Sequence, residues 1–389
     1  MDFNFRSKTM ENFSFYNPTK VHFGKDAISD LGKIATKYGS NALFIYGKTS
    51  IKNNGIYEKV VGQLKSNQIN IFEYSGIKSN PVLEDAENAV NLARQNNCEL
   101  IVAVGGGSVI DTAKIVSLCI VEDINVWELV KGKAKVNSSL PLLAVLTIAA
   151  TGSEMNQFAV LQNPATKEKN GFGHPLMFPK HSFLDPQFTF SVSKSQTTNG
   201  IVDLIAHSLE AFFAKGSSPL SDKFIASIIL EAMEISFQLL KEPTNYDLRA
   251  RMMWAATCAL NGIAYSGKSS SGDWGVHNIG HILSFLYDLP HGQTLSIAYP
   301  AWLKFHLNRI PKRISELGKL LFKTENSELT IEKLIGFFKS IESPVSLLEL
   351  GFSKNQKTEI IDLMKQNKVS GMNYKLSEYD YKDIVEKLF

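Results

Sequence analysis

Length, composition and charge describe a folded globular chain and exclude two classes of function. The 389 residues are 44% hydrophobic and 20% charged, which is typical of a globular protein with room for two domains. The chain has 41 lysines and arginines and 38 aspartates and glutamates, so its net charge is +3. This near balance lacks the excess of basic residues that is typical of nucleic-acid-binding proteins. No apolar run reaches the ~18 residues of a membrane helix, and we expect no secretory signal. Three widely spaced cysteines, Cys98, Cys119 and Cys258, favour a cytoplasmic protein.

The first half of the chain alternates strand-like and helix-like segments. Strands are predicted at residues 20–23, 41–47, 69–74, 99–104 and 142–147, with helices at 25–37, 56–66, 83–96 and 108–119 between them. The runs at 41–47 and 99–104 are apolar in the manner of buried parallel strands. This alternation predicts an α/β domain over residues 1–185, with a mostly parallel sheet covered on both faces.

The pattern changes after L-D-P at 184–186. Long helical patterns follow at residues 219–240, 246–265, 273–287 and 294–307, and few strand candidates remain. A kink is expected in the last of these at Pro300, because proline removes a helical hydrogen bond. We assign residues 186–389 to a second, all-helical domain.

A glycine-rich loop, G-G-G-S-V-I-D-T-A-K at 105–114, follows the strand at 99–104 and opens a helix. Three glycines allow close backbone approach, and a helix N-terminus offers N–H groups to phosphate, so we favour a dinucleotide phosphate site over a ligand-free turn. Ser108 is expected as the helix N-cap and as a phosphate donor. The loop is not G-x-G-x-x-G, since Ile110 occupies the third glycine position. Asp111 either complements the helix dipole or faces the nicotinamide, and the sequence leaves both readings open.

Histidines and acids at helical spacing indicate a metal site in the second half. In the apolar segment 200–213, Asp203 and His207 are four residues apart and share a helix face with Glu210. His277 and His281 repeat this spacing, and His291 follows a proline turn. The alternative for the first pair is a plain hydrogen bond between neighbours. Oxygen and nitrogen donors without sulfur suit Zn²⁺ or Fe²⁺. The five candidates, one more than a site of this kind needs, are Asp203, His207, His277, His281 and His291.

Four motifs in a fixed order make the chain resemble a known family. They are G-G-G-S-x-x-D-x-A-K, A-T-G-S-E at 150–154, G-x-x-D-x-x-x-H-x-x-E at 200–210, and D-W-G-V-H-N-I-G-H with H-G-Q-T after it. Together they are similar to the iron-containing (group III) alcohol dehydrogenases, in particular the butanol dehydrogenase and broad-range aldehyde reductase branch. The resemblance runs from about Phe13 to the C-terminus.

The resemblance implies a dehydroquinate synthase-like two-domain fold, usually dimeric, with the active site in the cleft between the domains. It implies hydride transfer between a nicotinamide and a primary alcohol or aldehyde at a divalent metal. The implied metal ligands are Asp203, His207, His277 and His291, with His281 beside the metal. The implied cofactor positions are Gly105, Gly106, Gly107 and Ser108 at the pyrophosphate, Thr147, Thr151 and Ser153 at the nicotinamide half, and Lys169.

Two further expectations concern His281 and the cofactor. His281 is the candidate for passing the proton to solvent, because imidazole titrates near neutral pH. After the strand at 41–46 the chain departs from the branch with G-K-T-S-I-K at 47–52. Gly47 stands where an acid would repel a 2′-phosphate, and Lys48, Ser50 and Lys52 can bind one, so NADP(H) is predicted over NAD(H).

Two other functions stay open at this point. A dehydroquinate synthase-like lyase would need several basic residues for a phosphate-bearing substrate, yet residues 262–292 hold only Lys268. A non-catalytic nucleotide-binding regulator would be expected to lack metal ligands. Both therefore rank below the dehydrogenase.

Overall fold

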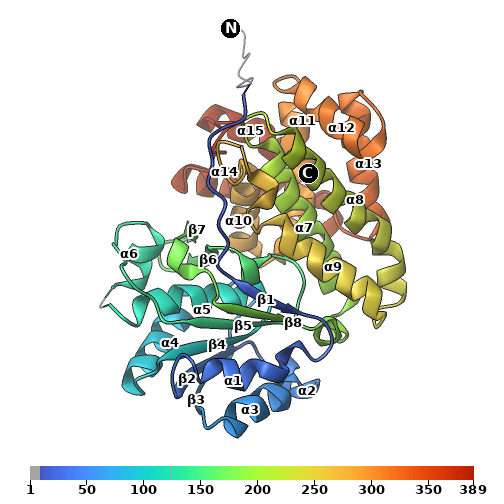
Figure 1. Ribbon diagram of the computed structural model, residues 1–389. Helices are drawn as coiled ribbons and strands as arrows, with labels where there is room; N and C mark the ends of the chain where they lie inside the picture. Colours follow the sequence, from blue (N-terminus) through green and yellow to red (C-terminus); the bar gives the residue numbers. More distant parts are fainter. Residues whose placement is uncertain (1–8, 123) are drawn as a thin grey trace. The chain divides into compact units, whose positions relative to one another are not determined.

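The computed structural model describes residues 9–122 and 124–389 (Figure 1). Contacts divide the chain into two compact units: a sheet-bearing unit of residues 17–193 and 242–257, and a helical unit of residues 9–16, 194–241 and 258–389. The boundary predicted at residue 185 lies shortly before Ser193. The prediction did not anticipate that residues 9–16 join the helical unit or that 242–257 join the sheet-bearing one, because such long-range contacts leave no local pattern.

The sheet-bearing unit is built on six parallel strands, which confirms the predicted fold class. They are β1 (Lys20–Phe23), β2 (Asn41–Tyr46), β3 (Asn70–Tyr74), β4 (Leu100–Gly105), β5 (Leu142–Leu146) and β8 (His181–Leu184), in the order β1-β8-β5-β4-β2-β3. From β2 the chain adds β3 on one side and then β4 on the other. The carboxyl ends of β2 and β4 therefore flank the point where strand order reverses, which is where open α/β sheets bind ligands.

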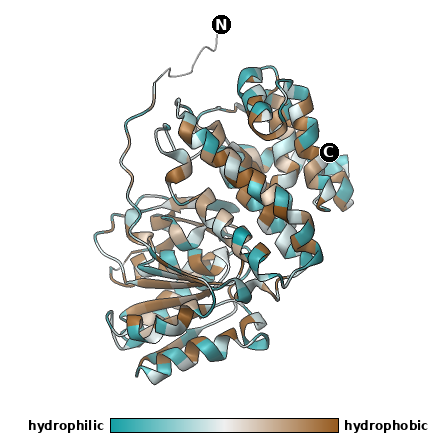
Figure 2. Cartoon of the chain, turned by 45° about the vertical axis from the view of Figure 1, so that its right-hand side comes forward, coloured by the Kyte–Doolittle hydropathy of each residue, from teal (hydrophilic) through white to brown (hydrophobic). Residues whose placement is uncertain are grey.

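Helices cover both faces of this sheet. On one face a core cluster joins Phe44, Val102, Val145 and Phe183 to apolar side chains of α1 (Leu31–Ala35) and α3 (Ile56–Ser66). On the other, α5 (Gly107–Cys119) packs against β4 and β5, and α4 (Leu83–Gln95) packs against α5. The short helices α2 (Ser50–Asn53) and α6 (Val126–Val130) lie in the connections. Figure 2 shows the strands as the apolar centre of this unit and the helices with one hydrophilic side.

Three parts of this unit differ from the predicted elements, and the first is strand β8, which was not predicted. The helix expected at 25–37 is reduced to a 3₁₀ turn, Ala27–Asp30, and the five-residue α1, because Asp26 adopts a left-handed backbone (φ 58°). An antiparallel hairpin of β6 (Phe158–Asn163) and β7 (Glu168–Gly173) was not predicted. In β6 buried and half-buried residues alternate, and β7 has no buried residue, so neither strand is buried throughout like those of the central sheet.

The second unit is helical, as predicted. Its helices are α7 (Lys194–Phe213), α8 (Pro219–Lys241), α10 (Gly275–Tyr287), α11 (His291–His306), α12 (Pro311–Phe322), α13 (Ser327–Ser340), α14 (Lys357–Gln366) and α15 (Glu378–Glu386); α9 (Tyr246–Ala259) lies mostly in the other unit. α11 contacts both α7 and α10. It begins at His291, three residues before the predicted start at 294, and carries Pro300 inside it. Within residues 9–122 and 124–389, no helix has the length and apolar character needed to cross a bilayer.

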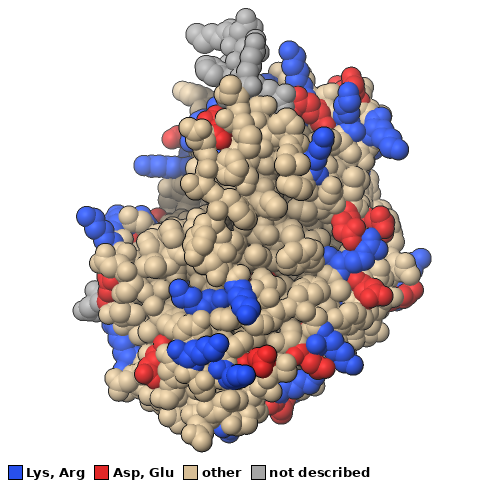
Figure 3. All heavy atoms as spheres, viewed as in Figure 1, with Lys and Arg blue, Asp and Glu red and all other residues tan. Residues whose placement is uncertain are grey.

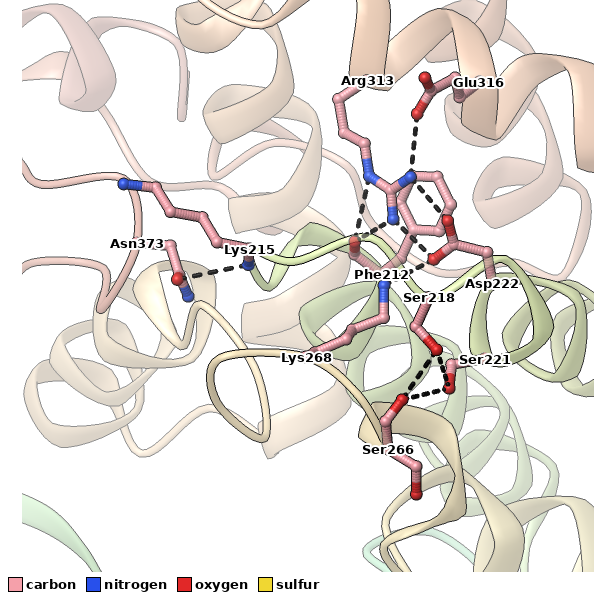
Figure 4. A network of polar contacts seen from close by, with 10 residues as sticks. All are labelled: Phe212, Lys215, Ser218, Ser221, Asp222, Ser266, Lys268, Arg313, Glu316 and Asn373. Atoms are coloured by element: carbon pink, nitrogen blue, oxygen red, sulfur yellow. Dashed lines mark hydrogen bonds and ion pairs between the residues drawn. The ribbon is translucent and has the colours of Figure 1, made fainter. Parts of the chain in front are cut away.

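A buried ion-pair network holds the segment that leads into α10 (Figure 4). The Arg313 guanidinium lies 3.4 Å from the ring centre of Phe212 and donates to both carboxylate oxygens of Asp222, at 2.7 and 2.8 Å. Lys268, whose side chain is buried, donates to the same carboxylate at 2.6 Å. The network therefore ties α12, α8 and the end of α7 to the loop before α10. Elsewhere, acidic and basic side chains are intermixed over the face drawn in Figure 3, in keeping with the near-balanced charge.

Candidate metal centre and dinucleotide loop

Three predicted ligands converge inside the helical unit. Asp203 and His207 come from successive turns of α7, and His277 from the first turn of α10. One side-chain donor atom of each lies within 4.8 Å of the others. All three are buried, with exposed fractions of 3 to 5%. A buried group of two imidazoles and a carboxylate needs a shared partner, and a cation supplies one.

His291 and His281 extend this group on one side. His291 is the first residue of α11, directly after Pro290, and its Nε2 lies 3.7 Å from Oδ1 of Asp203. Its ring centre is 5.3 Å from that of His277, and its side chain is 26% exposed. His281 lies one turn beyond His277, with its ring centre 5.7 Å from that of His291. The structure thus brings the four predicted ligands together and puts His281 next to the most exposed of them.

The donor set fits a divalent metal. Nδ1 of His207 makes no hydrogen bond to the described residues, and Oδ1 of Asp203 lies 3.6 Å away, too far for the hydrogen bond that was the alternative. Burial, with His277 alongside, lowers the pKa of His207 well below its ordinary value. His207 is therefore neutral and has a lone pair to give. Nitrogen and carboxylate donors in this number suit Zn²⁺ or Fe²⁺.

Glu210 is the residue at this centre to which no role was assigned from the sequence. It stands three residues after His207 on α7, and its Oε1 lies 2.8 Å from Nδ1 of His277. Its carboxylate also accepts the backbone N–H of Trp274 at 2.5 Å and of His277 at 3.2 Å. Burial raises the pKa of Glu210, and the backbone N–H groups that it accepts from His277 and Trp274 oppose this rise by stabilising the carboxylate. Its spacing from His207 was visible in the sequence, but its reach to α10 was not.

The glycine loop has the form of an anion cradle at the end of β4. Gly106 is the N-cap and α5 begins at Gly107, so the N-cap predicted at Ser108 is wrong by two residues. The N–H groups of Gly107 and Ser108 lie in the first turn of a 13-residue helix, where no helical acceptor exists. The Ser108 hydroxyl donates instead to the carbonyl of Ser79, at 2.5 Å.

The glycines at 105 and 107 also have a packing role. A Cβ at Gly107 would lie 2.4 Å from Thr151, and one at Gly105 would lie 2.5 Å from Val109. A Cβ at Gly106 would lie 3.2 Å from Ile148, so only a small shift of that side chain would make room for it. Close packing therefore explains two of the three glycines without any ligand.

The segment after β5 lies against this loop. The N–H of Thr147 donates to the carbonyl of Gly105, and Thr151 accepts from the N–H of Ser153 at 3.1 Å. Asp111 is buried and accepts from the Ser153 hydroxyl at 2.5 Å and from the Val160 N–H at 2.9 Å. Both oxygens of Asp111 are thus engaged by the protein. Its carboxylate holds the 147–160 segment beside the glycine loop, a use that neither of the readings left open from the sequence included.

The remaining predicted cofactor residues border the same end of the sheet. Lys169 on β7 donates to Oδ1 of Asn80 at 2.8 Å, next to the carbonyl that Ser108 uses. Gly47 follows β2, and Lys48 and Ser50 are exposed. Lys52 lies against two tyrosines. Its ammonium is 5.2 Å from the ring centre of Tyr46 and 4.7 Å from that of Tyr57.

Family models and known proteins agree with these features. The model described as iron-containing alcohol dehydrogenase matches residues 18–186, and the C-terminal model of the same family matches residues 197–389. The chain is 36% identical over 386 residues to NADH-dependent butanol dehydrogenase A of Clostridium acetobutylicum, covering 97% of this chain and 98% of that one. It is 34% identical to the NADPH-dependent aldehyde reductase YqhD of Escherichia coli, covering 92% and 94% of the two chains.

A solved structure gives the same result for the fold. The crystal structure of NADH-dependent butanol dehydrogenase A from Thermotoga maritima superposes with a TM-score of 0.93 at 37% identity, covering 98% of this chain and 99% of that one. Both halves of the chain match family models, and these relatives are matched over nearly their whole length. The chain therefore belongs to the iron-containing alcohol dehydrogenase family, in the branch of the butanol dehydrogenases and aldehyde reductases.

Proposed function

We propose that this protein is a metal-dependent, NAD(P)H-linked alcohol dehydrogenase and aldehyde reductase acting on butanol- or butanal-like substrates. The observation that carries the proposal is the buried convergence of Asp203, His207 and His277, with His291 at its open side. The named activities of the relatives, butanol dehydrogenase and aldehyde reductase, support the same reaction.

In this proposal the four residues hold one Fe²⁺ or Zn²⁺ ion. When bound, such an ion supplies a Lewis acid for the oxygen of an alcohol or aldehyde. Asp203 contributes the negative charge that offsets a buried cation, and the histidines contribute neutral nitrogen donors. Burial of three of the four side chains excludes water from the side away from His291.

The sheet-bearing unit binds the nicotinamide cofactor in this proposal. The N–H groups at the start of α5 bind the pyrophosphate, and the segment of Thr147, Thr151 and Ser153 lines the nicotinamide half. Hydride transfer requires the nicotinamide and the substrate carbon to meet in a fixed geometry.

We further propose a preference for NADP(H) over NAD(H). Relatives of both kinds exist by name, so the family alone does not decide the matter. Gly47 places no acid at the end of β2, and the exposed Lys48 beside it can pair with a 2′-phosphate. Lys52 already lies against Tyr46 and Tyr57, so we assign this role to Lys48.

His281 is proposed as the proton relay. It is 6% exposed and neighbours His291, the more exposed of the proposed ligands. An imidazole in this position can pass a proton between the substrate oxygen and solvent, because one ring nitrogen accepts a proton while the other donates one.

The two rival functions fit less well. A dehydroquinate synthase-like lyase needs basic side chains for a phosphate-bearing substrate, but Lys268 is buried in an ion pair with Asp222. A non-catalytic regulator would have no reason to retain a buried set of metal-binding side chains.

We also propose a homodimer. The edge strand β1 exposes Phe23, which packs against the exposed Trp254, and a second copy can cover this apolar pair. Light scattering tests this by measuring the mass of the protein in solution.

The proposed function is tested by following NADPH absorbance with butanal, in protein loaded with Fe²⁺ or Zn²⁺. The expected result is oxidation of NADPH that requires both metal and aldehyde. A matched sample with the sugar-phosphate substrate of dehydroquinate synthase is followed by release of inorganic phosphate, because that lyase leaves the nicotinamide absorbance unchanged over a cycle, and it should show no turnover. Metal-loaded protein that turns over no aldehyde or alcohol from C2 to C8 with either cofactor would overturn the proposal.

A further inference from the structure

We propose that Glu210 is a positioning residue of the metal centre, which fixes the His277 ring so that Nε2 is the nitrogen offered to the metal. The inference rests on the proposed function, because it assigns a role beside the proposed ligand set. Glu210 itself is not a ligand in this proposal. It acts through His277 and through the first turn of the helix that carries His277.

The contacts of the carboxylate carry the first step. Oε1 of Glu210 lies 2.8 Å from Nδ1 of His277, and both side chains are nearly fully buried, Glu210 at 2% and His277 at 5% exposed. Each oxygen also accepts a backbone N–H, Oε2 from Trp274 and Oε1 from His277. A carboxylate surrounded by N–H donors acts as an acceptor, so Nδ1 of His277 must carry its proton. Nε2 then keeps the lone pair for a metal, since a neutral imidazole has one proton only.

The start of α10 explains why this carboxylate comes from another helix. Trp274, at the N-cap, has a left-handed backbone (φ 62°) and no side-chain cap. Glu210 reaches across from α7 and accepts the N–H of His277, at the third helical position, which such a cap would take, and also that of Trp274. A negative charge is favourable at a helix N-terminus, so one carboxylate holds both the helix end and the ring that projects from it.

His207 and Glu210 come from adjacent turns of α7, so the same helix presents a proposed ligand and the partner of another. Residues that hold a ligating histidine through its second nitrogen raise its basicity and fix its tautomer, and their loss costs about 10- to 100-fold in metal affinity. That range is the size of effect expected here.

Asp273 is the matched control. It is a buried carboxylate that neighbours Glu210, with its N–H donating to the Glu210 carbonyl at 3.2 Å. Its Oδ1 accepts the N–H groups of Asn373 and Tyr374, both at 2.7 Å. It therefore supports the same region through the 372–374 loop, and among the described residues its carboxylate hydrogen bonds to backbone N–H groups and to no histidine ring. A loss of metal that came merely from loosening this region would appear in both variants.

The experiment measures Zn²⁺ affinity by chelator competition, and the visible spectrum of the Co²⁺-loaded protein, for wild type, Glu210→Gln and Asp273→Asn. We expect Glu210→Gln to bind Zn²⁺ about 10- to 100-fold more weakly and to shift the Co²⁺ bands. Asp273→Asn should stay within about threefold of wild type. Equal affinities for wild type and Glu210→Gln, or equal losses in the two variants, would overturn the inference.

A second measurement covers the case in which Glu210→Gln does not fold. In metal-free wild type labelled with ¹⁵N-histidine, the His277 ring should be the Nδ1–H tautomer, and an Nε2–H tautomer would refute the role of Glu210. Failure of the proposed function would give a result distinct from these. The wild-type protein itself would then bind no Zn²⁺, or its Zn²⁺ affinity would equal that of His277→Ala.

Discussion

Replacing Gly47 with aspartate tests the cofactor assignment at a position that can accept the change. A Cβ at Gly47 would lie 3.7 Å from the Ile77 carbonyl and 3.9 Å from Val109, which are ordinary contacts, and its φ is not in the left-handed range. The substitution therefore adds a charge without forcing the backbone. Any change in cofactor preference then reflects electrostatics and hydrogen bonding.

The expected size follows from the exposure of the loop. Two unit charges about 4 Å apart interact by ~1 kcal/mol in water and ~4 kcal/mol at a partly shielded protein surface. For a half-exposed site we take about 1–3 kcal/mol of repulsion against a 2′-phosphate, which is about 5- to 150-fold in kcat/KM. Lys48 is exposed, so Lys48→Ala should remove only ~1 kcal/mol, about fivefold.

The assay measures kcat/KM for NADPH and NADH with butanal as the fixed substrate. Wild type should prefer NADPH, Gly47→Asp should lose or invert the preference through KM, and kcat should change little. Lys52→Ala is the matched control, since this lysine lies over Tyr46 and Tyr57, and it should change the ratio by less than about twofold. A wild-type preference for NADH, or a larger effect from Lys52→Ala than from Lys48→Ala, would refute the reasoning.

Three further predictions concern histidines. His277→Ala should lose both bound metal and activity, measured by metal analysis of the purified protein, and full activity after metal stripping would contradict its role. His281→Ala should keep stoichiometric metal while kcat falls roughly 10²- to 10⁴-fold, and metal loss matching that of His277→Ala would make it a ligand. Burial lowers the pKa of His306 to about 3, so the unfolded chain takes up its proton below pH 6.5 and the folded protein does not. His306 alone should contribute a fall in stability of ~2 kcal/mol from pH 7.5 to 5. Urea unfolding of His306→Phe should lack this component, and an unchanged pH dependence would show that His306 is not its source.

The elements that carry the site were predictable because their patterns are local. The spacing of Asp203 and His207 placed both on one helix face, and the apolar run before Gly105 placed the loop at the end of a buried strand. Both follow from helix and strand periodicity, which the sequence displays directly.

Contacts between distant segments were not predictable in the same way. That Glu210 reaches His277, or that Asp111 binds Ser153 and Val160, depends on how separate elements pack. The Ser108 hydroxyl donates to the carbonyl of Ser79, a residue 29 positions earlier, and no local pattern reveals that contact. Polar side chains in buried positions find the nearest available acceptor, and periodicity carries no information about which one that is.

Metal bound at the histidine cluster should control the rate of the reaction. The measurement is the butanal-dependent oxidation rate of NADPH as a function of bound metal, in one preparation stripped by chelator and titrated with Fe²⁺ or Zn²⁺. We predict a rate near zero without metal that rises in proportion to occupancy and levels off at one ion per chain. An undiminished rate in metal-free protein would contradict the account.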